Sequence, residues 1–394
     1  MKRTLLTLAA AALLATACDS DPDPTETPDA GSVDAGSPDG GPGDAGPGDG
    51  GTGDGGTDAG CENPTYTEDV SACQPAATDY RPRDPAANNG PEDAWPACIS
   101  DTNTYSPIDP NISTVARVAA FDQLAVKLWK DGKVPTNLEF VESLDLFTQP
   151  EGLASRVQRR EDVHYPPAPN GGRCRDQGVP ETAPDRCVGP AKLLPIINDA
   201  FTRGARGETP RVQAARIEAA LLWFLYVSPL SEVTSCGGAP KDCDSAWAYY
   251  TGGTERAVPK GLAAYVKALG PETHERAYDA ALAVRCWRNL DNETGTATNT
   301  AMQQRALNQY DTALLRGTAL ILRQRLTELT CGDTEGNGAR LAFINTIGPF
   351  FDRAARAINP ARADALKAEV EKTDAEAVDV DAAVAALDAL FPCP

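Results

Sequence analysis

The chain has only two histidines, His164 and His274, and this scarcity limits the chemistry available to it. A Ser-His-Asp or Cys-His catalytic site would have to use one of them. Glu161 and His164 are spaced i,i+3, so on a helix they would share a face, with Asp162 beside them. Di-iron carboxylate bundles present ligands at this Glu-x-x-His spacing, but they need the motif twice and here it occurs once. A metal site at Glu161, Asp162 and His164 therefore competes with a simpler interpretation.

In that simpler interpretation the segment is a solvated helix end, and its two acids pair with Arg159 or Arg160. The second histidine also has two interpretations. His274 and Glu275 open the zinc-protease pattern H-E-x-x-H, but Tyr278 stands where the second histidine is required. The pattern therefore fails, and acids near a helix N-terminus are explained by the helix dipole. We keep His274 and Glu275 as candidate ligands only.

Three further acids are candidates for metal binding. Glu218 lies near the start of the most apolar segment, where a charge must be paired or must bind a metal ion. We expect a buried salt bridge to an arginine of another helix, such as Arg160 or Arg285. Asp242 and Asp244 bracket Cys243 before an aromatic stretch that ends in two glycines, and Asp244 is predicted to be an N-cap. The alternative is a carboxylate and phenol cluster, which suits a hard cation such as Fe³⁺.

The N-terminus predicts export from the cytosol. Lys2 and Arg3 precede an apolar run, and small residues then precede Cys18. This layout resembles a bacterial lipoprotein signal, which implies a lipid on Cys18, although Ala15 holds the position usually given to leucine. A plain secretory signal cut near Ala17 is the alternative. We expect a lipid-anchored protein of the cell envelope, either periplasmic or on the cell surface.

Ten cysteines remain after Cys18, an even number that fits an exported protein whose thiols all pair. No C-x-x-C motif occurs. The local pairs Cys174–Cys187, Cys236–Cys243 and Cys61–Cys73 are plausible, but sequence alone does not fix the connectivity. The ten candidates for disulfides are Cys61, Cys73, Cys98, Cys174, Cys187, Cys236, Cys243, Cys286, Cys331 and Cys393.

Four regions follow from composition. Residues 1–18 are the signal, and residues 19–60 are an acidic Asp/Gly/Pro tether with eleven acids and no base, which we expect to be disordered. Residues 61–110 form an irregular lead-in that carries three cysteines, and residues 111–394 form the helical domain. The net charge of −20 falls to −11 for residues 61–394, and no basic stripe occurs. We therefore expect no nucleic-acid partner, and membrane attachment only through the lipid.

Apolar residues after position 110 recur with helical spacing, and alternating β-branched runs are almost absent. We therefore predict an all-α, disulfide-stapled helical bundle, with two loosely similar halves as an option. A capping box at Thr136 and Glu139 opens a helix that runs to about Phe147. The other predicted helices are Asn111–Asp131, Pro150–His164, Pro190–Arg203, Val212–Val227 as the central buried helix, Pro271–Leu290, Thr298–Leu329, Ala339–Ile358, Ala363–Lys372 and Ala375–Leu390.

Several of these blocks together resemble a known family. The blocks Ser155–Tyr165 (SRVQRREDVHY), Gln213–Pro229 (QAARIEAALLWFLYVSP) and Lys241–Gly253 (KDCDSAWAYYTGG) are similar to the low-iron-inducible, iron-assimilating periplasmic proteins of green algae. Arg117–Phe121 and Arg285–Arg288 fit the same pattern. The resemblance spans roughly residues 110–390 and implies a secreted protein linked to iron uptake or storage. It does not assign ligands position by position.

Two functions follow as expectations. The first is an envelope lipoprotein that binds iron or another metal and assists its assimilation, and iron is then its cofactor or cargo. The second is a non-catalytic interaction protein of the cell envelope that binds no metal. We do not expect an enzyme, because the sequence has no nucleophile elbow, phosphate loop or complete metal triad.

Overall fold

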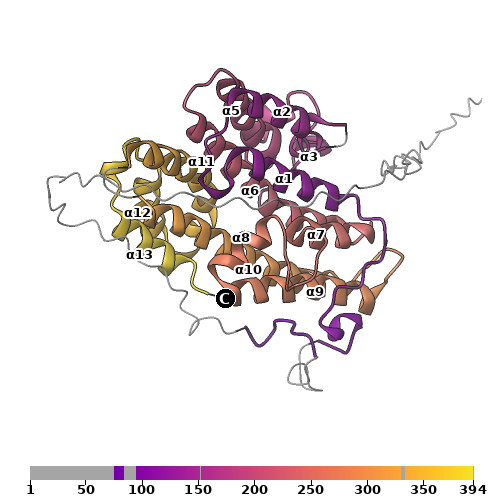
Figure 1. Cartoon of the computed structure of the whole chain (residues 1–394). Helices are drawn as coiled ribbons and strands as arrows, with labels where there is room; N and C mark the ends of the chain where they lie inside the picture. The colour runs from indigo at the N-terminus through magenta and orange to yellow at the C-terminus, as the bar shows by residue number, and fades with distance from the viewer. Residues whose placement is uncertain (1–74, 84–94, 151, 330–332, 394) are drawn as a thin grey trace, which may run out of the picture. The chain divides into compact units, whose positions relative to one another are not determined.

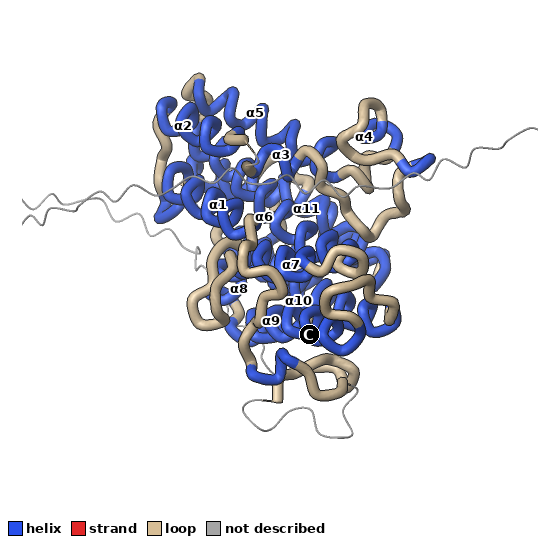
Figure 2. The backbone as a smooth tube through the Cα atoms, turned by 90° about the vertical axis from the view of Figure 1, so that its right-hand side faces the viewer, coloured by secondary structure: helices blue, strands red, loops and turns tan. Residues whose placement is uncertain are grey.

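The computed structural model describes residues 75–83, 95–150, 152–329 and 333–393, and these residues belong to one compact unit. In this part of the chain the regular structure is entirely helical, with no strand (Figure 2). The predicted all-α class is therefore confirmed. None of the described helices combines the length and the apolar character that a membrane span requires. Residues 1–60 lie outside the described residues, so the signal and the tether stay predictions.

Helices α1 to α13 follow one another in chain order, and α12 and α13 pack beside α11 and α10 (Figure 1). Their bounds are α1 Thr114–Leu128, α2 Asn137–Thr148, α3 Leu153–Val157, α4 Val179–Thr182, α5 Leu194–Ala205, α6 Pro210–Ser235, α7 Lys241–Thr251, α8 Leu262–Leu269, α9 Pro271–Asp291, α10 Thr300–Thr327, α11 Thr334–Ile358, α12 Pro360–Val370 and α13 Val380–Leu390.

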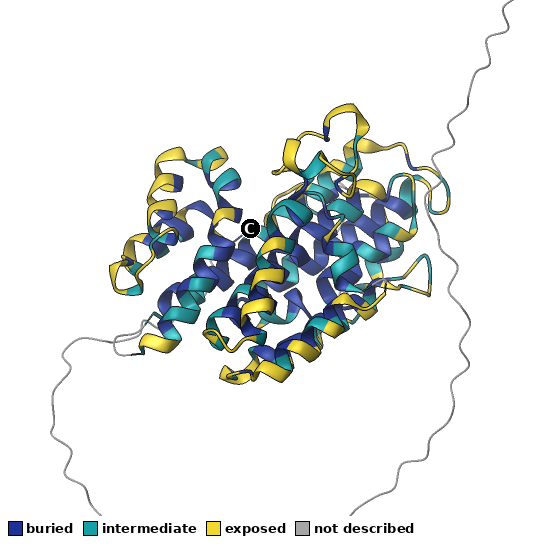
Figure 3. Ribbon diagram, turned by 90° about the horizontal axis from the view of Figure 1, so that it is seen from above, coloured by how far each residue is buried: buried dark blue, intermediate teal, exposed yellow. Residues whose placement is uncertain are grey.

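Helix α6 forms the centre of the core, as its apolar sequence predicts. Every residue from 217 to 230 is buried, and α6 packs against α5, α7, α10 and α11. Figure 3 shows that buried residues gather inside the helical bundle and that exposed residues lie on its outside. A helix that is apolar on all sides must be surrounded by others, because any exposed face would leave apolar area in water. The polar side chains that α6 carries are therefore held in a buried setting, and each needs a partner.

Two local predictions near α2 have different outcomes. The capping box is confirmed, since the Glu139 backbone N–H donates to Thr136 Oγ1 and the Thr136 N–H donates to Glu139 Oε2. The predicted helix Pro150–His164 is wrong, because α3 ends at Val157. Backbone bonds beyond that point run to another segment: the Asp162 N–H donates to the carbonyl of Arg186 at 2.7 Å. Glu161 and His164 therefore do not share a helix face.

The described part of the lead-in is irregular apart from the 3₁₀ turn Ile99–Thr102, and it docks on the helices through specific bonds. The Gln309 side chain contacts both backbone polar groups of Tyr80, each at 2.9 Å. Asp244 is fully buried and accepts the N–H groups of Ile108 and Asp109. Asp244 is thus not the N-cap of α7, since Pro240 holds that position; it anchors the lead-in instead.

Three disulfides join described cysteines: Cys98–Cys286, Cys174–Cys187 and Cys236–Cys243. Two of the predicted local pairs are therefore confirmed. Cys393 is also disulfide-bonded. The proposed pair Cys61–Cys73 and the residue Cys331 lie outside the described residues. The long-range bridge Cys98–Cys286 ties the lead-in to α9, which residue spacing gave no means of predicting.

Candidate functional site

His164 lies on an irregular segment that is tied down next to a disulfide. The Gly189 N–H donates to the carbonyl of Arg160 at 3.1 Å, and Arg186, the neighbour of Cys187, holds Glu161 in an ion pair of 2.6 Å. The His164 backbone N–H donates to Asp162 Oδ1 at 3.0 Å, which is an Asx turn. The turn aims the imidazole ring at α6 and α10.

The ring of His164 lies between two carboxylates. Its Nδ1 is 2.6 Å from Asp162 Oδ1, and its Nε2 is 2.9 Å from Asp311 Oδ2 on α10. The phenol of Tyr226 on α6 donates to Asp311 Oδ1, and its ring is nearly parallel to that of His164. His164, Asp162 and Asp311 side chains are 15, 10 and 26% exposed, so the group reaches solvent only at one edge.

The charges of this group are coupled. Burial alone would lower the pKa of His164, but the hydrogen bonds to Asp162 and Asp311 raise it to about 9. Burial would raise the pKa of Asp311, whereas the hydrogen bond and charge of His164 lower it. The pKa of Tyr226 is raised well above its usual value by burial and by Asp311. At neutral pH the group therefore holds an imidazolium between two carboxylates, next to a neutral phenol.

Asp311 contacts two other potential ligands, because its Oδ2 lies 2.9 Å from His164 Nε2 and its Oδ1 accepts the Tyr226 phenol. Asp162 contacts the opposite ring nitrogen, so it cannot ligate the same ion but can fix the ring and its tautomer. A proton on Nε2 occupies the place that a cation would take. A metal ion bound to nitrogen and oxygen ligands here would have to replace that proton.

His274 serves a different purpose. It is fully buried on α9, its Nε2–H donates to the carbonyl of Arg256, and its Nδ1 accepts from the Tyr250 phenol. Burial lowers the pKa of His274, so the ring is neutral. With both nitrogens engaged, His274 holds the Arg256 loop on α9 and offers no atom to a metal ion.

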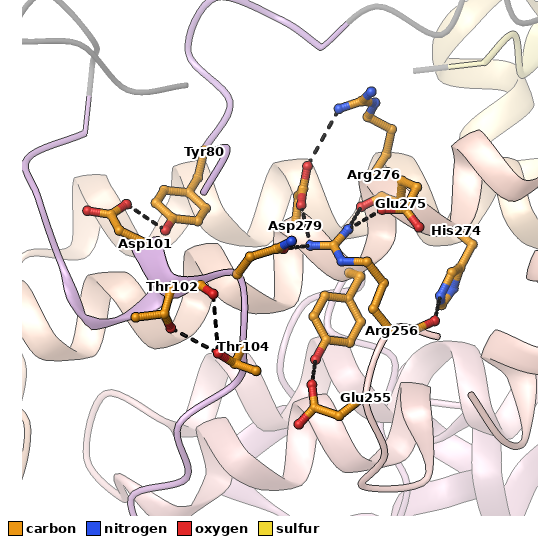
Figure 4. A network of polar contacts seen from close by, with 12 residues as sticks. Tyr80, Asp101, Thr102, Thr104, Glu255, Arg256, His274, Glu275, Arg276 and Asp279 are labelled. Atoms are coloured by element: carbon orange, nitrogen blue, oxygen red, sulfur yellow. Dashed lines mark hydrogen bonds and ion pairs between the residues drawn. The ribbon is translucent and has the colours of Figure 1, made fainter. Parts of the chain in front are cut away.

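Glu275 also belongs to this network and not to a ligand set. Arg256 contacts Glu275 Oε2 at 2.6 Å, Asp279 at 2.7 Å and the Asn103 side chain at 2.7 Å (Figure 4). The guanidinium also lies 4.3 Å from the centre of the Tyr278 ring. One arginine thus joins its own loop, α9 and the lead-in, and the acids around it are neutralised by it.

Glu218 forms the buried salt bridge that its position predicts, but with another partner. It bonds Arg325 of α10 at 3.0 Å and accepts the Tyr265 phenol, so the expected partners Arg160 and Arg285 are wrong. Arg160 pairs instead with Glu232 at 3.0 Å. The sequence cannot distinguish these arginines, because the choice depends on which helix packs against α6.

Asp242 and Asp244 do not form one cluster. Asp244 faces the lead-in, where it also accepts the Tyr105 phenol at 3.0 Å. The pKa of Asp242 is raised to about 6, first by burial and then by the charge of Glu232. The candidate ligands of the sequence are therefore spread over five places. Asp162 and His164 contact each other, with Glu161 on the same segment, and His274 and Glu275 share the network of Arg256.

Within the described ranges, no group of three or more His, Cys, Asp and Glu side chains is arranged to hold a metal ion. The His164 group reaches three ligands, namely His164, Asp311 and Tyr226, only if the Tyr226 phenol is counted as one of them. No sequence pattern marks Asp311 or Tyr226 as part of a site, because Asp311 is one acid among many and Tyr226 lies inside an apolar run. The two residues are 85 positions apart in the sequence, so no local motif contains both of them.

Comparison of the chain with protein-family models, with curated proteins and with solved structures found no match.

Proposed function

We propose that this protein binds a metal ion, with iron as the preferred metal, at His164, Asp311 and Tyr226. The observation that supports this most is that one carboxylate, Asp311, contacts both an imidazole nitrogen and a phenol, with Asp162 on the far ring nitrogen. Fe³⁺ is a hard cation and favours oxygen ligands. A histidine that binds a metal ion through one ring nitrogen usually donates its other ring N–H to a carboxylate or a carbonyl, as His164 can to Asp162. In this proposal the ion is the cargo that the protein binds, and it is not a catalytic cofactor.

Loading requires the loss of protons. The imidazolium of His164 must release its Nε2 proton, and the Tyr226 phenol must release its own if it binds as phenolate. A trivalent ion offsets the charge of both anionic ligands, and this favours the exchange. Together with the lipoprotein signal that the N-terminal sequence predicts, such a site fits an envelope protein that assists iron assimilation.

The experiment is equilibrium dialysis of the full chain against Fe³⁺ and Fe²⁺, with visible spectroscopy of the loaded protein. We expect one ion per chain and, for Fe³⁺, a phenolate charge-transfer band. Tyr226→Phe should remove the band, and Asp311→Asn should remove most binding, whereas Tyr165→Phe and Asp145→Asn are matched controls. Binding no greater than that of an acidic control protein, or an unchanged band in Tyr226→Phe, would refute the site.

A second candidate is an interaction protein without metal, and a surface feature favours it. Four large apolar side chains are exposed around α1 and α2: Val126, Val134, Leu138 and Val141, at 45–64% of their surface. A local group of this kind suits contact with another protein. Leu138→Ser with Val141→Ser should abolish a saturable cross-link to an envelope partner and leave iron binding unchanged. Iron binding without any such partner would exclude this candidate.

A further inference from the structure

A second site of a different kind lies at the opposite end of α6. A cavity of about 370 Å³ opens where the N-termini of α6 and α11 meet the C-termini of α1 and α10. The helix faces that border it carry small side chains, namely Ala214 and Ala215 on α6 and Gly336 and Ala339 on α11. These residues leave the space unfilled, while longer charged side chains surround it.

The acids around the cavity are all paired with cations of its own lining, whereas two of its cations are paired outside the lining. Three acids line it, Glu218, Glu328 and Asp333, and two arginines of the same lining already hold them. Arg325 contacts Glu218 at 3.0 Å and Glu328 at 3.1 Å, and Arg340 contacts Asp333 at 2.9 Å. A cationic ligand would therefore have to displace an arginine from each acid.

Two further cations line the cavity, and their acidic partners are not part of the lining. Lys133 pairs with Glu139, and Arg211 lies 3.5 Å from Glu335, whose side chain is 65% exposed. Solvent reaches the Lys133 and Arg211 side chains, which are about one-third exposed, and ion pairs of this kind contribute little, so an anion in the cavity can compete for both cations. In a chain of net charge −20, four cations around one cavity are a local exception.

The α6 and α11 residues of the lining lie on one face of the first turns of each helix, so the cavity borders both helices from the side. The walls also include Trp129 and Phe343, which offer an apolar surface. A ligand with carboxylates at one end and a short carbon skeleton matches this distribution.

We propose that this cavity binds a small organic anion with two or three carboxylate groups. Its carboxylates contact Arg211 and Lys133, and its skeleton lies against Trp129 and Phe343. The site is separate from the His164 group: Glu218 precedes Tyr226 by eight residues of one helix, which is about 12 Å at 1.5 Å per residue. Anion binding therefore does not depend on the proposed metal function.

The test is isothermal titration of the metal-free full chain with citrate and with succinate, and with sodium chloride at equal ionic strength. We expect saturable binding of at least one carboxylate and none of chloride. Arg211→Met removes a cation and Ala339→Phe fills the space without a change of charge, so each should weaken binding at least about tenfold. Arg203→Met, which removes an exposed cation paired with Glu208, is the control and should bind normally.

Three results would overturn the proposal. They are the absence of saturable binding of both probes up to about 10 mM, unchanged binding in Arg211→Met and Ala339→Phe, and an equal loss in Arg203→Met. Because Arg211 lies at the cavity rim with a partly exposed side chain, its replacement tests the proposal even if Ala339→Phe does not fold. Circular dichroism of each variant separates lost binding from lost folding.

Discussion

Asp162 contacts the proposed metal site only through another residue. Its carboxylate holds His164 Nδ1 at 2.6 Å and the His164 backbone N–H at 3.0 Å, on the side of the ring away from Asp311. Asp162→Asn keeps an acceptor there but removes the charge that makes the imidazole a stronger ligand. We expect iron affinity to fall about 10- to 100-fold, while the phenolate absorption of Tyr226 keeps its wavelength. Competition dialysis against a chelator measures the affinity, and a lost band would contradict a role of Asp162 that is limited to His164.

Asp242 has a predictable effect on stability because its pKa is raised to about 6 by burial and by Glu232. An acid with a raised pKa favours the folded state when protonated. Its contribution is complete below the ordinary value of 3.8 and is lost as the pH rises through about 6. The asparagine of Asp242→Asn stays neutral at every pH. Above pH 7 the free energy of unfolding of this variant should therefore be about 1–2 kcal/mol higher than that of the natural protein.

Urea denaturation of both proteins from pH 4 to pH 8 checks this expectation. The difference between them should shrink as the pH falls and vanish near pH 4. Asp145→Asn, at an exposed position of α2, should show no pH-dependent difference. A constant difference across the range would assign the effect of Asp242→Asn to lost hydrogen bonds and not to charge.

The histidines show how far side-chain chemistry can be predicted from sequence. Both were found as candidates because histidine is rare in this chain, and one of them lies in a group with paired carboxylates. The partners of His164 were not found, since Asp311 and Tyr226 come from two long helices whose packing no local pattern specifies. His274 and Glu275 looked similar in sequence, yet burial and Arg256 make them structural.

Helix packing depends on glycines whose role differs with their surroundings. A Cβ atom at Gly204 of α5 would lie 2.4 Å from the ring of Phe140, which is fully buried on α2. Alanine favours a helix over glycine by roughly 1 kcal/mol, but the overlap forces α2 and α5 apart. We expect Gly204→Ala to lower the free energy of unfolding by about 1–3 kcal/mol, as measured by urea denaturation.

Gly338 of α11 is the matched control. Its added Cβ would meet Val212 at 3.8 Å, an ordinary contact, so only the helix preference remains. Gly338→Ala should therefore stabilise the protein by about 0.5–1 kcal/mol. If both alanines stabilised the protein, the close approach of α2 and α5 would be wrong.

Helix existence followed from the sequence wherever the apolar period was long, as in α6, α9 and α10. The spacing of apolar residues does not predict the short helices correctly. It gives no helix at α8, and it predicts that α3 runs to His164 although α3 ends at Val157. The segment after Val157 has helical composition, but its backbone groups bond to Arg186 and Gly189, and this tertiary pairing outweighs propensity. α3 therefore ends early, and this frees His164 to turn toward α10.

The lead-in is part of the folded domain although it has little regular structure. Tyr80, Trp95 and Tyr105 are buried, and Tyr105 stacks on Trp247 of α7 with ring centres 4.4 Å apart. Together with the bonds to Asp244 and Gln309, these contacts close the bundle across α7, α9 and α10. The composition of residues 61–110 predicted irregular structure, but it could not predict how much of it packs.

The bridge Cys98–Cys286 should therefore be the most stabilising of the three described disulfides. It spans 188 residues, against 13 for Cys174–Cys187. Loop closure in the unfolded chain predicts a contribution of about 5 kcal/mol for the first and about 3 kcal/mol for the second. Urea denaturation of Cys98→Ala/Cys286→Ala and of Cys174→Ala/Cys187→Ala measures both losses. A larger loss from the short loop would mean that the lead-in adds little to the bundle, and that the polypeptide around His164 depends on its local bridge instead.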